Sequence, residues 1–289
     1  MIGSLASVYE RFGDAHREFD CCDTTFRIQT TGIRADAAVT AARETAASLE
    51  AQLNAFDETS AVSQLNREGE VANEHVARIV RRGLEYHDRT DGVFDVHQGR
   101  VEHDLKAFLR GDSDSLPATF DTGTVHVDGA TVTTDVELDL NGLAKGYIVD
   151  RTAETLAGLG RRGFVSGGGD MSPPTGPVAI ESPYGDDTPL KILDTDWPVA
   201  TSGGYRRSRS GTDHVYDPTT ETAGSRHESV TVVARRDCME ADAVATALAV
   251  LPLAEARELA VEWEGLEALI IHDGVFRTTE GFDTHVMDA

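Results

Sequence analysis

The sequence LDLNGLAKGYIVD, residues Leu138–Asp150, decides the fold prediction because it joins a strand pattern to a helix pattern through one short turn. Residues 136–140 predict a strand, and the chain then turns through Asn141 and Gly142 into a helix. Backbone N–H groups are free at the start of such a helix, and Lys145 in its first turn adds a cation. This junction is therefore a candidate site for a phosphate group or a metal ion.

Outward from this junction, helices and strands follow one another irregularly. Apolar residues that recur every three or four positions predict helices, and alternation predicts strands. The expected helices cover residues near 3–18, 35–56, 72–89, 141–160 and 239–251, the last with Asp237 as N-cap, and the expected strands include 24–32, 267–274 and a hairpin that turns at Asp128 and Gly129. This mixture without regular βαβ repeats predicts an α+β fold. We expect a single domain over residues 1–289, with two tightly packed lobes as the alternative.

Acidic residues dominate the composition. Fifty Asp and Glu face 26 Lys and Arg, which gives a formal net charge of −24, and Lys106, Lys145 and Lys191 are the only lysines. Because the carboxylates are spread along the whole chain, we expect an acidic solvated surface that keeps the protein dispersed at high salt, and hence a halophilic source. The same charge argues against nucleic acid and anionic membranes as partners.

The three cysteines, Cys21, Cys22 and Cys238, have no metal-binding spacing and predict no disulfide framework, which favours a reducing compartment. No run of about 18 apolar residues predicts a membrane span. Residues 1–22 lack the basic start and the apolar stretch of a secretory signal. We therefore expect a cytoplasmic protein.

Asp242 and Thr246 lie four residues apart in ADAVATAL, so a carboxylate and a hydroxyl project from the same helix face. Hard oxygen donors at this spacing suit Mg²⁺, which keeps waters and substrate phosphates as its other ligands. Taken alone, a solvated aspartate and a threonine bonded to its own helix are the commoner outcome. The small apolar residues around Asp242 make an unpaired charge there costly, which favours the metal hypothesis.

The stretch ATSGGYRRSRSGTDHVYDP, residues 200–218, holds the densest basic cluster of the chain, formed by Arg206, Arg207 and Arg209. The cluster fits an anionic ligand, or it offsets the surrounding carboxylates. His214, with Asp217 three residues on, is a candidate general base because the histidine pKa lies near neutrality. A surface histidine without a catalytic role is the alternative. The glycine turn at residues 166–170, SGGGD, is either a phosphate cradle or a loop that needs unusual torsions.

Six motifs in one order carry a family resemblance. They are SAVSQLN (60–66), GVFD (92–95), LDLNGLAKGYIVD (138–150), GGGD (167–170), TSG (201–203) with HVYDP (214–218), and ADAVATAL (241–248). In this order they resemble the ApbE family of FAD:protein FMN transferases. Phosphate-binding GxxxxGK[ST], GxGxxG after a strand, GxSxG and HExxH are all missing. The resemblance implies mixed helices and antiparallel sheets, in T-fold-like layers, around a central flavin and metal site.

The resemblance also implies roles for individual residues. Mg²⁺ is expected on Asp242, Thr246 and the carbonyl of Gly142, and His214 is the expected base. FAD is expected to contact a wider set, namely Phe56, Val93, Phe94, Asp95, Asp139, Lys145 and Val215. The implied reaction transfers FMN from FAD to a Ser or Thr hydroxyl of an acceptor flavoprotein and releases AMP, and we expect the enzyme to be a monomer.

Two alternatives stay open, and departures from the family pattern favour the non-catalytic one. Where many relatives have MGT, this chain has Asp23-Thr24-Thr25 after Cys22; Phe56 stands in place of a tyrosine, and Gly142 replaces the usual alanine. The segment after HVYDP also differs. The alternatives are a Mg²⁺-dependent FAD pyrophosphatase, in which water replaces the protein hydroxyl, and an FAD-binding protein without turnover.

Overall fold

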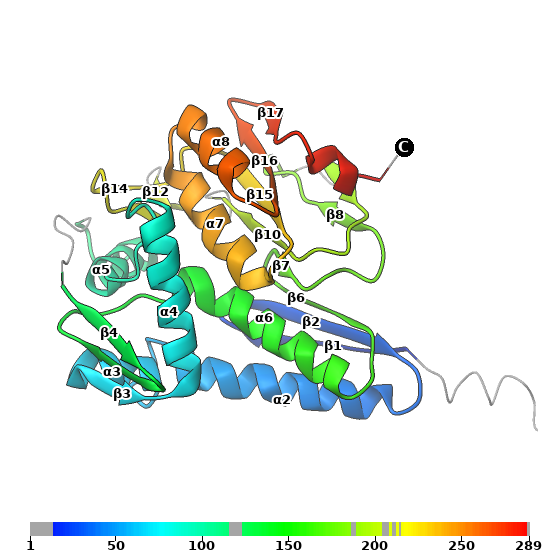
Figure 1. Cartoon of the computed structure of the whole chain (residues 1–289), viewed down its shortest axis with the longest axis horizontal. Coiled ribbons are helices and arrows are strands. Elements are labelled where there is room, and N and C mark those ends of the chain that lie inside the picture. The colour runs from blue at the N-terminus through cyan, green and yellow to red at the C-terminus, as the bar shows by residue number, and fades with distance from the viewer. Residues whose placement is uncertain are drawn as a thin grey trace, which may run out of the picture.

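The computed structural model describes residues 14–115, 123–185, 189–203, 208–209, 212–213 and 215–287. Its main element is an eight-stranded sheet in which all neighbouring strands are antiparallel (Figure 1). In spatial order the strands are β1 (Asp14–Cys21), β2 (Thr24–Thr31), β6 (Gly163–Gly167), β7 (Asp170–Met171), β10 (Val199–Ser202), β15 (Ser229–Ala234), β16 (Leu266–His272) and β17 (Val275–Thr278). Mixed helices and antiparallel sheets confirm the predicted α+β class.

Helices cover one face of this sheet, as Figure 1 shows for α2, α6 and α7. They are α2 (Ala35–Leu53), α6 (Asn141–Gly158), α7 (Cys238–Val250) and α8 (Leu253–Glu262). The opposite face packs against β8 (Val178–Ile180), β9 (Lys191–Leu193) and the short helix η3 (Phe282–His285). Strand β15 is buried throughout because Val230 and Val232 point to the helices while Val233 points to the other side.

A smaller group of elements lies beside the large sheet. It contains α3 (Ala61–Glu68), α4 (Glu74–Arg89), α5 (Gly99–Arg110) and a sheet of β3 (Glu70–Ala72), β5 (Thr131–Thr134) and β4 (Val125–Asp128). The predicted hairpin turn is confirmed, since Asp128 pairs with Thr131 and Gly129 adopts a φ of 57°. Short hairpins β11 (Ser208–Arg209) with β12 (Thr212–Asp213) and β13 (Tyr216–Asp217) with β14 (Thr222–Ala223) complete the described elements.

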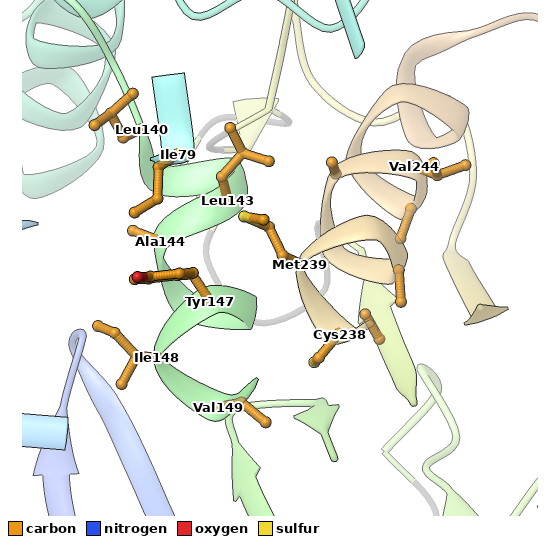
Figure 2. Close-up of a cluster of buried hydrophobic side chains, with 14 of the residues drawn as sticks. Ile79, Leu140, Leu143, Ala144, Tyr147, Ile148, Val149, Cys238, Met239 and Val244 are labelled. Carbon is orange, nitrogen blue, oxygen red and sulfur yellow. The ribbon is translucent and has the colours of Figure 1, made fainter. Parts of the chain in front are cut away.

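Helices α6 and α7 pack unusually close together at Gly146. A Cβ at this position would lie 2.6 Å from the carbonyl oxygen of Cys238 and 2.8 Å from the Cα of Met239. Figure 2 shows the side chains of Leu143 and Met239 meeting between the two helices. The glycine therefore sets the separation of the helices that carry the two main site motifs.

The start of α7 is capped from two sides. Asp237 accepts a hydrogen bond from Glu240 N at 2.8 Å, which confirms the predicted N-cap. Asp150 of α6 accepts the backbone N–H groups of Cys238 and Met239 at 2.9 and 3.0 Å. The caps fix the register of α7 against α6.

Two expected elements are wrong. The expected helix near 3–18 is replaced from Asp14 onward by β1, in which Ala15 and Cys21 are buried at alternating positions against β2. The segment over 136–140 forms no regular strand, although Asp139 N donates to Val96 O at 2.9 Å and Glu137 O accepts Gly99 N at 3.1 Å. The side-chain amide of Asn66 takes the place of a neighbouring strand, accepting from Leu138 N at 2.8 Å and donating to Leu138 O at 3.0 Å. Among the described residues, no helix combines the length and apolar composition needed to cross a bilayer.

Candidate active site

One cavity of about 890 Å³ contains every described residue that the sequence predicted for the site. It opens between the sheet and the helices α5, α6 and α7. The predicted residues on its wall are Phe56, Val93, Phe94, Asp95, Asp139, Gly142, Lys145, Val215, Asp242 and Thr246. They come from five separate segments, so the fold assembles a site that is dispersed in sequence.

The predicted metal donors meet where α6 begins. The carboxylate of Asp242 accepts the backbone N–H of Gly146 at 3.2 Å. In a regular helix this N–H faces the carbonyl of Gly142, four residues earlier, so the carbonyl lies near the carboxylate. A Cβ on Gly142 would lie 3.7 Å from Thr246 Oγ1. The two motifs therefore share one corner of the cavity, as the metal hypothesis requires.

A buried ion-pair group adjoins this corner. Lys145 Nζ lies 2.9 Å from Asp170 Oδ2 and 3.5 Å from Asp242 Oδ1. Burial alone lowers the pKa of Lys145, but the two carboxylates outweigh it and raise this pKa above its usual value. Burial and the nearby Asp242 raise the pKa of Asp170, and Lys145 opposes this rise. The ammonium is thus held charged at the cavity wall.

Asp170 is the site residue that the sequence prediction missed. The motif GGGD was assigned to its glycines, and Gly168 and Gly169 do adopt φ values of 63° and 120° in the β6–β7 turn. The turn also places Asp170 at 0% exposure beside Lys145. The sequence signal that could have identified Asp170 is an acidic residue directly after a glycine turn.

The corner fits a magnesium ion. Neither carboxylate oxygen of Asp170 has a well-oriented hydrogen-bond partner in the described chain, and both are buried. Thr246 Oγ1 donates to the backbone carbonyl of Asp242 at 2.9 Å, which leaves its oxygen lone pairs available. Carboxylate, hydroxyl and carbonyl oxygens form the donor set that Mg²⁺ prefers, with waters and phosphates as the other ligands.

The GVFD motif forms a rigid aromatic wall. Phe94 is 6% exposed, its N–H donates to Thr90 Oγ1 at 2.9 Å, and its ring packs edge-on against Tyr86. Burial alone raises the pKa of Asp95, but hydrogen bonds from the side chain and backbone of His97 and from Gln98 lower it below the usual value. Asp95 is therefore a fixed carboxylate at the cavity edge.

A second aromatic face lies across the cavity on Phe56. Its ring is 42% exposed and has Lys106 Nζ and the Arg110 guanidinium at 5.1 and 5.0 Å from its centre. Lys106 Nζ also lies 3.7 Å from Glu102 and 3.9 Å from Asp139. Burial and the charge of Asp139 raise the pKa of Glu102 to about 8. The exposed ring of Phe56 can thus stack on a planar ring, with two cations close to its own centre.

His214, Arg206 and Arg207 lie outside the described residues, and the side chain of Arg209 is not described either. The described neighbours of His214 are firmly placed. Asp213 accepts Val215 N at 2.9 Å and Ser225 N at 2.8 Å, and Val215 is 4% exposed on the cavity wall.

Oxygen donors, a buried ammonium and two aromatic rings lie around one cavity of this α+β protein, an arrangement that fits a divalent cation together with a phosphorylated aromatic ligand. The chain belongs to the ApbE family, whose model matches residues 22–270.

Comparisons with known proteins agree with this assignment. The chain is 28% identical over 263 residues to the FAD:protein FMN transferase of Vibrio cholerae, covering 80% of this chain and 77% of that protein. It is 32% identical over 159 residues to the protein of the same name from Treponema pallidum, covering 47% and 44%. The crystal structure of an ApbE protein from Thermotoga maritima matches 96% of this chain and all of its own with a TM-score of 0.82 at 23% identity. The flavin transferase ApbE of Vibrio cholerae matches 95% of this chain and 99% of its own with a TM-score of 0.78 at 22% identity.

Proposed function

We propose that this protein cleaves FAD with the help of Mg²⁺ and transfers the FMN part to a Ser or Thr hydroxyl of an acceptor flavoprotein. The observation that carries the proposal is the shared corner of Asp242, Thr246 and Gly142, which lies against Lys145 and the aromatic wall of Phe94. The names of the relatives from Vibrio cholerae and Treponema pallidum support the transfer of FMN from FAD to protein.

Different residues of the cavity bind different parts of FAD. Phe94 and Val93 face the flavin ring, and Phe56 stacks on the adenine. Lys145, held charged by its carboxylate partners, attracts the pyrophosphate between the two rings. Asp242, Thr246 and the Gly142 carbonyl would hold Mg²⁺, which would neutralise negative charge on the pyrophosphate.

The chemistry is a single phosphoryl transfer. The acceptor hydroxyl oxygen bonds to the phosphorus of the FMN half, the bond from that phosphorus to the bridging oxygen breaks, and AMP leaves with that oxygen. His214 is proposed to take the hydroxyl proton, a contribution of about 100- to 10,000-fold for a well-placed base. The buried carboxylates of Asp213 and Asp217, each tied to backbone N–H groups, hold the flanking segment in place.

One assay distinguishes transfer from the alternatives. The protein is incubated with FAD, Mg²⁺ and an acceptor domain that carries a Ser or Thr flavinylation motif, and the mixture is separated on a denaturing gel. Flavin fluorescence that stays with the acceptor, together with free AMP, is the expected result. Free FMN with an unlabelled acceptor would instead identify a pyrophosphatase, and intact FAD would identify a binding protein without turnover.

Two variants test the assigned roles. Asp242→Ala is expected to abolish Mg²⁺-dependent transfer, whereas Asp88→Ala, at a surface position with an 87% exposed side chain, keeps it. His214→Ala is expected to slow transfer much more than it weakens FAD binding. Full activity of Asp242→Ala would remove the metal assignment, and equal losses of turnover and FAD affinity in His214→Ala would remove the general base.

A further inference from the structure

Two sulfur atoms and a carboxylate converge beside the cavity, where the end of β1 and the turn after it meet the last turn of α2. Cys21, Cys22 and Glu50 each bring one donor atom to within 4.8 Å of the others. Cys22 and Glu50 line the cavity, whereas Cys21 is 1% exposed behind them. Both cysteines are free thiols.

The distance between the two sulfurs indicates whether the adjacent cysteines are placed for a disulfide or for a metal ion. Cys21 Sγ and Cys22 Sγ are 3.8 Å apart. A disulfide bond is about 2.0 Å long, so the two sulfurs would have to move together by almost half of their present distance. Two thiolates on a tetrahedral zinc ion, each with a bond of about 2.3 Å, lie about 3.8 Å apart. The observed spacing therefore matches the edge of a metal tetrahedron.

The backbone holds the three donors in place without a metal. Cys22 and Asp23 form the two-residue turn between β1 and β2, with φ values of 55° and 54°, as in a type I′ hairpin. Glu50 comes from the last turn of α2, and its Oε1 accepts the backbone N–H of Cys22 at 2.5 Å. The site is thus built by a hairpin, a helix and the hydrogen bond that joins them.

We propose that Cys21, Cys22 and Glu50 bind a thiophilic divalent cation such as Zn²⁺, with a fourth coordination position open to the cavity. Each thiol loses its proton to solvent as its sulfur bonds to the cation, and the carboxylate completes an S₂O donor set. The donor set is soft, so it discriminates against Mg²⁺, which the oxygen corner at Asp242 prefers. Because Cys22 and Glu50 form part of the cavity wall, an occupied site obstructs ligand entry. This consequence rests on the proposed binding of FAD in the same cavity.

Cadmium titration tests the metal site directly, because thiolate-to-Cd²⁺ charge transfer absorbs in the ultraviolet and needs no enzymatic activity. The full-length protein is expected to saturate at one equivalent of CdCl₂ with release of protons, and a large excess of MgCl₂ is expected to leave the band unchanged. Cys22→Ser should halve the band, and Glu50→Gln should keep it while weakening affinity at least about tenfold. Cys238→Ala, at a buried thiol on α7, is the matched control and should behave like the parent protein.

A band of parental amplitude in Cys22→Ser, or no band in the parent protein, would overturn the site. Circular dichroism establishes that each variant is folded, and Glu50→Gln provides an independent test should Cys22→Ser fold poorly. FAD affinity is then measured with and without ZnCl₂, and Zn²⁺ is expected to weaken it in the parent but not in Cys22→Ser. Unchanged affinity refutes only the obstruction, whereas absence of FAD binding in metal-free protein refutes the proposed function and leaves the cadmium result standing.

Discussion

Replacing Gly146 with alanine tests the helix contact that positions the site. The added Cβ would lie 2.6 Å from Cys238 O, and ordinary contact begins near 3.4 Å, so α6 and α7 must separate by about 0.8 Å. Overpacking of this kind costs about 1–3 kcal/mol, while alanine regains about 1 kcal/mol of helix propensity over glycine. We therefore expect a net destabilisation of up to about 2 kcal/mol.

The effect on activity should be larger than the effect on stability. Asp242 lies on α7 one turn beyond the contact, and its partners Lys145 and Gly146 lie on α6. A misplacement near 1 Å can cost about 100-fold in rate, so a shift of this size is expected to reduce transfer by about ten- to a hundredfold. Urea denaturation and the fluorescent gel assay measure the two effects separately.

Gly158 in the same helix supplies a matched control. A Cβ on Gly158 meets no atom within 4 Å, so Gly158→Ala is expected to be neutral or stabilising by up to about 1 kcal/mol, with normal activity. If Gly146→Ala is as stable and as active as Gly158→Ala, the close contact between α6 and α7 does not exist in solution. Loss of stability with full activity would show instead that the contact does not position Asp242.

Further predictions concern the second aromatic face, the buried charges and the acidic surface. Phe56→Ala is expected to weaken FAD binding by about 1–3 kcal/mol, and Phe56→Tyr to retain it, as measured by quenching of flavin fluorescence. The pKa of Glu102 is raised to about 8 from the usual 4.5, so its contribution to stability is complete below about pH 4.5 and is lost as the pH rises through 8. Glu102→Gln should therefore flatten the decline of the free energy of unfolding between pH 4.5 and pH 8, as measured by urea denaturation. Lys145→Arg places a wider guanidinium between Asp170 and Asp242, so transfer is expected to fall by about ten- to a hundredfold although the charge is kept. The free energy of unfolding should rise with KCl between about 0.1 and 1 M, as the screening length falls from about 10 to about 3 Å, and a flat salt profile would remove the halophilic hypothesis.

The parts of the site that the sequence predicted are those encoded by local spacing. Asp242 and Thr246 share a face because they are four residues apart on one helix, and Asp237 caps that helix through its own side chain. The pairing of Lys145 with Asp170 is different, since it depends on a β-turn brought to α6 by the sheet. No local pattern contains that contact.

The two elements that the sequence predicted wrongly also depend on partners that are distant in the sequence. Residues 14–21 contain acceptable helix formers, but pairing with β2 makes period-two burial more favourable than a surface helix. The segment 136–140 alternates like a strand, but its backbone bonds to the Asn66 amide at Leu138 and to Val96 and Gly99 rather than to a regular strand. The hydrogen bond from Cys22 N to Glu50 also joins residues 28 positions apart, so the spacing of the cysteines does not reveal it.

Gly142 joins the corner formed by Asp242 and Thr246 to the aromatic wall at Phe94. A Cβ there would lie 3.0 Å from Phe94 Cε2 and 3.3 Å from Cζ, tighter than side chains normally tolerate. The aromatic ring therefore occupies space that the alanine expected from the family pattern would fill. Since Phe94 is also fixed by Thr90 and Tyr86, it can approach the corner this closely only because position 142 lacks a side chain. The departure at Gly142 is thus coupled to the placement of Phe94, and in the proposed function a ring held against the first turn of α6 would keep the flavin next to the proposed metal donors.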